Sequence, residues 1–188
     1  MTIHNKFKGV ESSRLRLRPF HALDLDNFVR YRANPNVARY QSWENFTREQ
    51  GMKFIEEMLQ ASFNNPGEYY QIAIELKDTN ELIGDCVMHP LTDDPAQVEI
   101  GFTLEPRYQG NGYAIEAINC FVDYLFTALK KHRVIAITDV RNKPSVKLLE
   151  RLGMRREGHF LKNIWFKGEW GSEYLYAILR EEWTNKHD

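Results

Sequence analysis

The clearest hydrophobic pattern of the chain lies between residues 98 and 129. From 98 to 104, apolar residues alternate with polar or small ones, a period of two that is typical of a half-buried strand. From 114 to 129, apolar residues recur at spacings of three and four, which predicts an amphipathic helix. Pro106 ends the strand, and Gly110 and Gly112 lie between the two elements. The pattern therefore predicts a strand, a glycine-rich turn and a helix in succession.

The same reasoning predicts elements on both sides of this stretch. Thr47 and Gln50 have the spacing of a capping box at a helix start, and the Asn34–Asn36 segment contains a proline that breaks a helix. The continuously apolar residues 134–137 predict a strand that is covered on both faces. The further predicted elements are strands at 14–18, 72–76, 82–88, 160–166 and 173–179, and helices at 22–29, 47–59 and 142–152.

The resulting order of elements is β-α-α-β-β-β-α-β-α-β-β. This order predicts an α/β (α+β) protein with a mixed, mostly antiparallel central sheet flanked by helices. A chain of 188 residues is long enough for one full hydrophobic core, so we expect a single domain over residues 1–188.

Composition and charge exclude several classes of protein. Lys and Arg number 25 against 26 Asp and Glu, so no net positive charge is present to hold nucleic acid. Residues 1–8 are polar, and no apolar run approaches membrane-spanning length. Cys86 and Cys120 lack C-x-x-C spacing, and the six histidines lack zinc-ligand spacing. We therefore expect a cytoplasmic protein with reduced, buried thiols and no metal site, membrane contact or nucleic-acid partner.

The glycine-rich turn has the features of an anion-binding site. The first N–H groups of a helix lack intrahelical acceptors, and glycine lets a phosphate approach the backbone closely. A dinucleotide-binding G-x-G-x-x-G motif would need a third glycine at position 115, where the chain has Ile115. The spacing of Arg107, Gly110 and Gly112 resembles the acetyl-CoA pyrophosphate loop of GNAT N-acetyltransferases. Residues 108–117 are similar to its RimJ/RimL-like branch, the ribosomal-protein N-terminal acetyltransferases.

A second stretch also resembles the GNAT family. Residues 142–158 match the family's spacing at Asn142, at Ser145, at the Leu149–Met154 run and at Gly158. The GNAT fold has the predicted order of elements, so the resemblance covers nearly the whole chain. It implies acetyl-CoA as co-substrate and no metal.

The backbone N–H groups of the turn are suited to bind the cofactor phosphates, and the resemblance implies that the pantetheine arm lies along the strand at 102–104. An N–H group of that strand would then polarise the thioester carbonyl. The predicted cofactor-binding residues are Phe102, Thr103, Leu104, Arg107, Gln109, Gly110, Asn111, Gly112, Tyr113, Ala114 and Asn142.

Two residues are candidates for catalysis. Glu99 shares a strand face with Gly101, where a missing side chain leaves room for a ligand, so Glu99 could act as the base or orient the amine. The alternative is a carboxylate that is ion-paired or solvated at the sheet face. Many GNAT enzymes have, on the helix that corresponds to residues 142–152, a tyrosine that acts as the acid protonating the leaving thiolate. This chain has no tyrosine there. Ser145 or a water would then protonate the thiolate, unless no protein acid is needed.

Aromatic residues of the first third of the chain are candidates for the acceptor site. In the GNAT family the early helices and their loop cover this site, which suggests Tyr31, Tyr40 and Trp43 as its wall. The alternative is that these side chains belong to the core, as aromatic residues commonly do. His89 is assigned a structural role.

These features predict direct acetyl transfer from acetyl-CoA to a primary amine. Neither cysteine lies in either motif, which disfavours a covalent acyl-enzyme. The leading acceptor is the N-terminal α-amine of a (ribosomal) protein. The alternatives are a small amine or aminoglycoside, or a non-catalytic acyl-CoA-binding module. A homodimer is an expectation only from the general frequency of homo-oligomers.

Overall fold

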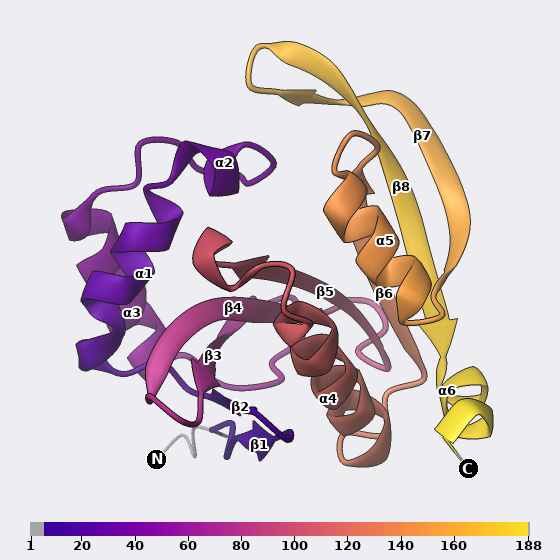
Figure 1. Cartoon of the computed structure of the whole chain (residues 1–188). Helices are drawn as coiled ribbons and strands as arrows, with labels where there is room; N and C mark the ends of the chain where they lie inside the picture. The colour runs from indigo at the N-terminus through magenta and orange to yellow at the C-terminus, as the bar shows by residue number, and fades with distance from the viewer. Residues whose placement is uncertain (1–5, 188) are drawn as a thin grey trace.

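The computed structural model describes residues 6–187, so the expectation about the polar start falls partly on residues 1–5, which lie outside this range. The elements follow the predicted order, with short additional ones (Figure 1). They are β1 (Val10–Glu11), β2 (Leu15–Arg18), η1 (Ala22–Asp24), α1 (Leu25–Arg32), α2 (Pro35–Ala38), α3 (Arg48–Gln60), β3 (Tyr70–Leu76), β4 (Glu81–Pro90), β5 (Gln97–Leu104), η2 (Pro106–Tyr108), α4 (Tyr113–Thr127), β6 (Arg133–Asp139), α5 (Lys143–Arg151), β7 (Arg155–Phe166), β8 (Glu169–Leu179) and α6 (Arg180–His187).

Eight strands form one sheet in the order β1-β2-β3-β4-β5-β6-β8-β7. Neighbouring strands are antiparallel except β5 and β6, which run parallel and are joined through α4. A parallel pair needs such a crossover connection, and a helix commonly provides it. The predicted mixed, mostly antiparallel sheet flanked by helices is confirmed.

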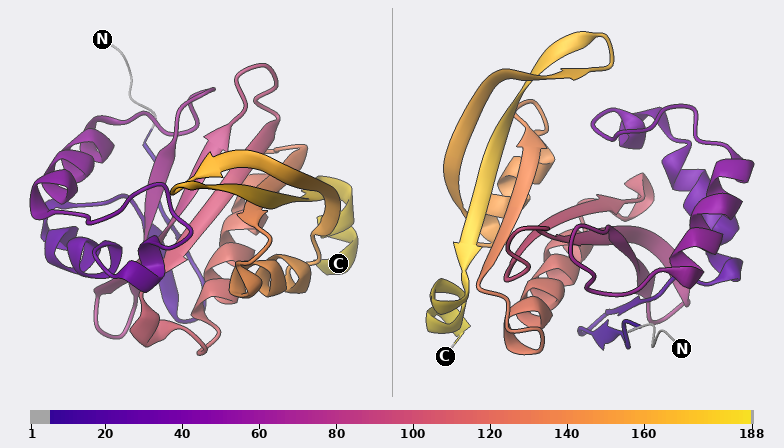
Figure 2. Two further views of the ribbon diagram at one scale, coloured as in Figure 1. Left: turned by 90° about the horizontal axis from the view of Figure 1, so that it is seen from above. Right: turned by 180° about the vertical axis from the view of Figure 1, so that it is seen from behind.

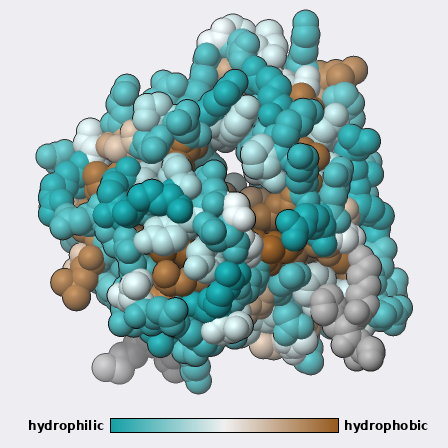
Figure 3. All heavy atoms as spheres, in the orientation of Figure 1, coloured by the Kyte–Doolittle hydropathy of each residue, from teal (hydrophilic) through white to brown (hydrophobic). Residues whose placement is uncertain are grey.

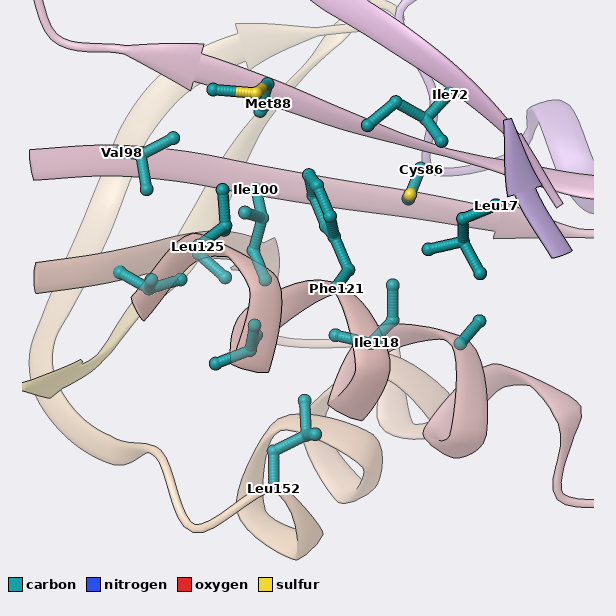
Figure 4. Close-up of a cluster of buried hydrophobic side chains, with 14 of the residues drawn as sticks. Leu17, Ile72, Cys86, Met88, Val98, Ile100, Ile118, Phe121, Leu125 and Leu152 are labelled. Carbon is teal, nitrogen blue, oxygen red and sulfur yellow. The ribbon is translucent and has the colours of Figure 1, made fainter. Parts of the chain in front are cut away.

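The main core lies between the sheet and α4. Ile118, Phe121 and Leu125 of α4 point at Val98 and Ile100 of β5, and all five side chains are at most 2% exposed (Figure 4). Burying each such side chain contributes roughly 1.5–3 kcal/mol. The helical spacing of three and four thus places one face of α4 on the alternating face of β5.

A second core lies on the opposite face of the sheet, under α1 and α3. Phe28 and Tyr31 of α1 and Ile55 of α3 pack with Ala73 and Leu82, two residues that alternate with the strand positions facing α4. The capping box of Thr47 and Gln50 at the start of α3 is present as predicted. The sheet therefore separates two helical layers, which Figure 2 shows from two directions.

Three sequence predictions need correction. The strand at 134–137 is not covered on both faces, because β6 diverges from β5 and leaves Ile137 41% exposed. The Asn34–Asn36 segment does not only end α1. It also begins α2, since the Asn34 side chain caps the new helix by accepting from Asn36 N at 2.9 Å. Finally, β7 and β8 are longer than predicted and form a hairpin that arches toward α2 (Figure 1).

The thiols and the helices bear on other expectations. Cys86 is buried, Cys120 is half-buried, and both are free thiols. Burial raises the pKa of Cys120 to about 11, so its thiol stays protonated near neutral pH. Within residues 6–187, no helix combines the length and apolar character needed to cross a bilayer. The same residues contain no group of three or more His, Cys, Asp or Glu side chains arranged to hold a metal ion.

Candidate active site

The turn before α4 presents backbone N–H groups at a helix N-terminus. Gly112 is the N-cap residue of α4, which begins at Tyr113. Gly110 and Gly112 both have φ +80°, a left-handed conformation that glycine adopts without the steric cost of a Cβ. Because the first N–H groups of a helix have no intrahelical acceptor, this turn can bind an anionic group such as a phosphate.

Side chains on both sides brace this turn. Gln109 Nε2 donates to Leu104 O at 2.9 Å, and Asn111 Nδ2 donates to Gln109 O at 3.1 Å. From the segment before β2, Arg14 Nη1 donates to Asn111 O at 3.1 Å, and Arg14 also forms an ion pair with Glu116 of α4 at 2.6 Å. Asn111 was predicted to contact the cofactor, but its side chain supports the turn from within.

Arg107 was also predicted to contact the cofactor, and the structure places it elsewhere. Its Nε lies 2.6 Å from Glu105 Oε1, and its Nη2 lies 3.1 Å from Glu81 Oε1. The Glu105 side chain is only 5% exposed, so it needs cations nearby, and Arg30 supplies a second one at 3.0 Å. These carboxylates, with hydrogen bonding to Glu105 first, raise the pKa of Arg107. The guanidinium is thus engaged away from the turn.

The strands β5 and β6 separate after a short parallel contact. They pair at only three positions, from Gln97 to Glu99 on β5, whereas β4 pairs with β5 as far as Leu104. Within the described part of the chain, the β5 edge from residue 100 to 104 therefore has no strand partner on the β6 side. Free backbone groups on a strand edge can hydrogen-bond to an extended ligand, which supports the predicted role of residues 102–104.

A larger cavity of about 380 Å³ lies between this open edge, the turn and α5. Most of the predicted cofactor residues line it, and Lys147 and Arg151 of α5 add positive charge. Its lining includes Phe102, Thr103, Leu104, Gln109, Gly110, Gly112, Tyr113, Ala114, Asn142, Lys147 and Arg151. The glycine turn, the open strand edge and the basic side chains together fit an extended molecule that carries phosphates.

A smaller cavity of about 160 Å³ lies next to it, over the gap between β5 and β6. Residues of β6, β7 and β8 line its far side, including Ile137, Asp139, Ile164, Phe166 and Glu173. Figure 3 shows the surface hollowed between the two sides of the molecule. Five residues line both cavities: Tyr40, Gln41, Phe102, Asn142 and Ser145. A ligand in one cavity can therefore meet a ligand in the other at this shared wall.

Asn142 and Ser145 come to the shared wall from the start of α5. Asn142 is the N-cap residue, and its Oδ1 accepts a hydrogen bond from Ser145 N at 3.4 Å. The ordinary capping role is therefore present. Since both residues also line both cavities, capping fixes the Ser145 side chain at the junction.

Glu99 is half-buried on β5, two positions before Gly101 of the smaller cavity. Its Oε2 lies 3.9 Å from His89 Nδ1, and the His89 ring stacks on Tyr69 with ring centres 4.1 Å apart. Burial raises the pKa of Glu99; His89 opposes this shift, and the negative charge of Glu173 adds to it. Glu99 itself is not among the residues that line the cavity; it lies beside Gly101 on the same face of the strand, as a carboxylate with raised proton affinity.

The three aromatic candidates have different positions. Tyr40 lines both cavities, and its hydroxyl donates to Arg141 O at 3.3 Å. Tyr31 is only 1% exposed and donates to Asp85, so the prediction that it lines the acceptor site is wrong. Trp43 lines neither cavity. Its ring lies 4.0 Å from the Arg32 guanidinium, and its indole N–H donates to Arg32 O at 3.1 Å.

Sequence reasoning missed Gln41, Phe166 and Glu173. Gln41 lies in a segment without periodicity, so no pattern distinguished it. For Phe166 and Glu173, the alternation of side chains along β7 and β8 shows which residues share a strand face, and both residues lie on the face that lines the cavity. Which face of the hairpin meets a cavity depends on the arch, and a local pattern does not encode that curvature.

Comparison with known proteins gives acetyltransferases, which agrees with a site that fits an extended molecule carrying phosphates. A family model described as an acetyltransferase (GNAT) domain matches residues 14–155. The chain is 34% identical over 175 residues to the Uncharacterized N-acetyltransferase YnaD of Bacillus subtilis (strain 168), covering 93% of this chain and 99% of that protein. It is also similar to the crystal structure of the acetyltransferase (GNAT family) from Bacillus anthracis, with a TM-score of 0.85, 34% identity and coverage of 93% and 99%.

Two relatives carry an acceptor in their names. The ribosomal protein uS5-alanine N-acetyltransferase of Escherichia coli (strain K12) is 31% identical over 123 residues, which cover 65% of this chain and 63% of that protein. The spermidine N(1)-acetyltransferase of Vibrio cholerae is 26% identical over 180 residues, which cover 94% of this chain and 99% of that protein. Similarity thus extends to relatives with different acceptors.

Proposed function

Because the chain belongs to the GNAT acetyltransferase family, and is an N-acetyltransferase, we propose that it transfers acetyl directly from acetyl-CoA to a primary amine. The observation that carries direct transfer is the shared wall between the two cavities. A cofactor in the larger cavity and an amine in the smaller one would meet there, so no covalent intermediate is needed. Holding two reactants side by side in adjoining cavities removes much of the entropic cost of their encounter.

In this proposal the larger cavity holds acetyl-CoA. The N–H groups of the glycine turn bind the pyrophosphate, and the open edge of β5 hydrogen-bonds to the pantetheine arm. Lys147 and Arg151, which line the same cavity, attract the phosphates. An N–H group of β5 near Phe102 polarises the thioester carbonyl and stabilises the oxyanion.

Two proton transfers complete the reaction. The amine nitrogen bonds to the acetyl carbon and loses a proton, which Glu99 accepts through a water, since Glu99 lies beside Gly101 but does not line the cavity. Burial raises the pKa of Glu99, which makes it a better proton acceptor than an exposed carboxylate. The sulfur leaves with the electron pair of the C–S bond and takes a proton at the shared wall. Ser145 is the predicted donor, and Tyr40 presents a phenol, a stronger acid than an alcohol, at the same wall.

We propose the N-terminal α-amine of a protein as the acceptor. A cavity of about 160 Å³ holds a group of roughly the size of benzene, so a longer acceptor inserts only its amine end. The rest of a polypeptide would lie in the hollow that Figure 3 shows. The resemblance to the RimJ/RimL-like branch and the uS5-alanine acetyltransferase relative support this acceptor.

A small cationic amine is the second candidate, and one observation favours it. Glu173 lines the smaller cavity and is hydrogen-bonded to the neutral Asn163 amide at 2.6 Å, while Glu99 lies 3.9 Å from His89 Nδ1. Burial is the main cause of the raised pKa of Glu99, and the negative charge of Glu173 raises it further, as expected for two nearby carboxylates. Two such carboxylates would attract a second ammonium group of a diamine or polyamine, and the spermidine relative supports this acceptor class.

An acceptor screen tests the proposal. Purified protein is mixed with acetyl-CoA and each of three acceptors: a peptide with a free N-terminus, the same peptide blocked at its N-terminus, and spermidine. Free thiol and product mass are measured. Acetylation of the free but not the blocked peptide supports the proposed acceptor, and preference for spermidine supports the second. Binding of acetyl-CoA without transfer to any amine would favour a non-catalytic acyl-CoA-binding module, and failure to bind acetyl-CoA would refute the cofactor assignment.

A further inference from the structure

Lys167, at the tip of the β7–β8 hairpin, reaches across to the segment after α2. Its Nζ donates to Ala38 O at 2.7 Å and to Trp43 O at 3.0 Å, and it lies 3.5 Å from Glu44 Oε1. These partners are more than 120 positions away in the sequence. The three contacts join the two sides of the molecule between which the hollow of Figure 3 lies.

The turn geometry explains why a lysine side chain reaches this far. Lys167 and Gly168 form the two-residue turn of the hairpin, with φ values of +49° and +85°. Such a turn matches the twist of the strands and places its first side chain at the outermost point of the hairpin. An ammonium group has three donors, which match two carbonyls and one carboxylate. The Lys167 side chain is 22% exposed, so these bonds are partly shielded from water.

The segment that Lys167 binds carries two residues of the shared wall. Ala38 and Trp43 bracket Tyr40 and Gln41, which line both cavities. The lysine therefore holds this segment on either side of the residues that face the ligands. Tyr40 also donates to Arg141 O, so the same segment is held from a second direction.

The far end of the segment is fixed in the second core. The Trp43 indole donates to Arg32 O at 3.1 Å, and the Arg32 guanidinium lies 3.3 Å from the buried Asp85 carboxylate of β4. Phe166, which precedes Lys167, lines the smaller cavity from the hairpin side. A break at Lys167 would therefore free the hairpin tip and the 38–44 segment from each other, while each stays attached to its own side of the sheet.

We propose that Lys167 is a clasp that closes the roof of the smaller cavity and fixes Tyr40 and Gln41 at the shared wall, so that it determines which acceptors enter. The proposal rests on the assignment of the smaller cavity to the acceptor. Lys167 does not touch the reacting atoms and is a positioning residue. With the clasp in place, an acceptor reaches the shared wall only through the space left beneath the roof.

The test compares Lys167→Met with Lys162→Met. Both lysines lie on the same hairpin with positive φ, but Lys162 contacts neither the 38–44 segment nor either cavity. Hydrogen exchange of the peptide spanning residues 38–44 is followed by mass spectrometry, and steady-state kinetics are measured with each substrate varied. A milder variant, Glu44→Gln, removes the negative charge of one of the three partners but keeps an amide oxygen as acceptor, and it keeps the proposal testable if Lys167→Met fails to fold.

For Lys167→Met we expect faster exchange over residues 38–44 and an acceptor KM raised about fivefold or more. The acetyl-CoA KM should rise less, because the glycine turn and the β5 edge, which Lys167 does not contact, also line the larger cavity. The KM of bulky acceptors should rise less than that of small ones, because an open roof leaves more room for a bulky acceptor. Lys162→Met should match wild type, and Glu44→Gln should shift exchange in the same direction by less. Faster exchange throughout the chain with no selective rise in the acceptor KM would show a general loss of stability and would contradict a local clasp.

Two outcomes would overturn the proposal, and they differ in meaning. Unchanged exchange over residues 38–44 would show that Lys167 holds nothing in place. Faster exchange with an unchanged acceptor KM would show that Lys167 holds the segment but does not control which acceptors enter. The assignment of the cavities is tested separately by the acceptor screen and by acetyl-CoA binding, so its failure can be told apart from failure of the clasp.

Discussion

Replacing Gly110 by alanine tests whether the turn before α4 binds phosphate. Gly110 has φ +80°, where an L-residue costs about 1 kcal/mol relative to glycine. A Cβ at this position would have no atom within 4 Å, so alanine should fit in the free protein. For a chain of this length, about 1 kcal/mol lowers Tm by about 2–4 °C. The free Gly110→Ala protein should therefore remain folded, and a large loss of acetyl-CoA affinity could not be explained by its small loss of stability.

Acetyl-CoA binding should be much more sensitive than stability. Gly110 lines the larger cavity, and a methyl group there would push a phosphate away from the backbone N–H groups. Loss of one charge-assisted hydrogen bond costs about 1.5–3 kcal/mol, which corresponds to a Kd about ten- to a hundredfold higher. The assay is calorimetric titration with acetyl-CoA, accompanied by a thermal melt of the free protein.

Gly168→Ala is the matched control. Gly168 has φ +85°, and a Cβ there would also meet nothing within 4 Å, but it lies in the β7–β8 turn outside the larger cavity. Both variants should lose similar stability, and only Gly110→Ala should lose affinity for acetyl-CoA. If Gly110→Ala binds acetyl-CoA within about twofold of wild type, the turn does not hold the phosphates and the reasoning from helix N–H groups fails.

Three further predictions concern other parts of the structure. Arg32→Met should lower the free energy of unfolding by about 3–5 kcal/mol in urea, because it leaves Asp85 buried without its cation, and the double variant with Asp85→Asn should lose less. Glu99→Gln should lower kcat/KM by about a hundredfold or more. In the wild type, the rate should fall at acidic pH as Glu99 becomes protonated, because only the ionised carboxylate accepts a proton. Burial raises the pKa of Glu99, so this fall should begin at a higher pH than for an ordinary carboxyl group, and Glu99→Gln should remove it. Ser145→Ala and Tyr40→Phe should show which hydroxyl protonates the thiolate, since the true donor should show the larger fall in kcat and equal losses would contradict a single donor.

The sequence predicted the elements whose causes are local. The alternation at 98–104, the helical spacing at 114–129 and the capping box at Thr47 each depend on neighbours within a few residues. Each is present, although α4 ends at Thr127, two residues earlier than predicted. The left-handed turn at Gly110 and Gly112 belongs to this class, because glycine at that spacing was the signal itself. Most of the predicted cofactor residues also line one cavity, but these were assigned from the family resemblance, since β5 and the start of α5 come together only in the folded chain.

The errors concern features that depend on distant parts of the chain. Tyr31 and Tyr40 are both aromatic residues of the early helical region, yet the first is buried against Asp85 and the second reaches a cavity. The two tyrosines cannot be distinguished by the sequence around them. Tyr31 is buried because β4 brings Asp85 next to its hydroxyl in the folded chain. Likewise, Ile137 is exposed because β5 diverges from β6, and Arg107 turns away because Glu105 is buried beside it.

Because β5 and β6 diverge, a cofactor bound as proposed would have a structural role as well as a chemical one. Only three residue pairs join these central strands, so the sheet is nearly interrupted there. A pantetheine arm along the free edge of β5 would take the place of a missing strand partner, and the loaded protein would then have a more continuous sheet than the free one. Ligand at a hundred times its Kd adds about 2.7 kcal/mol to stability, which for this chain corresponds to a rise in Tm of about 5–11 °C. This sparsely paired joint in the middle of the sheet would thus be reinforced only while acetyl-CoA is bound.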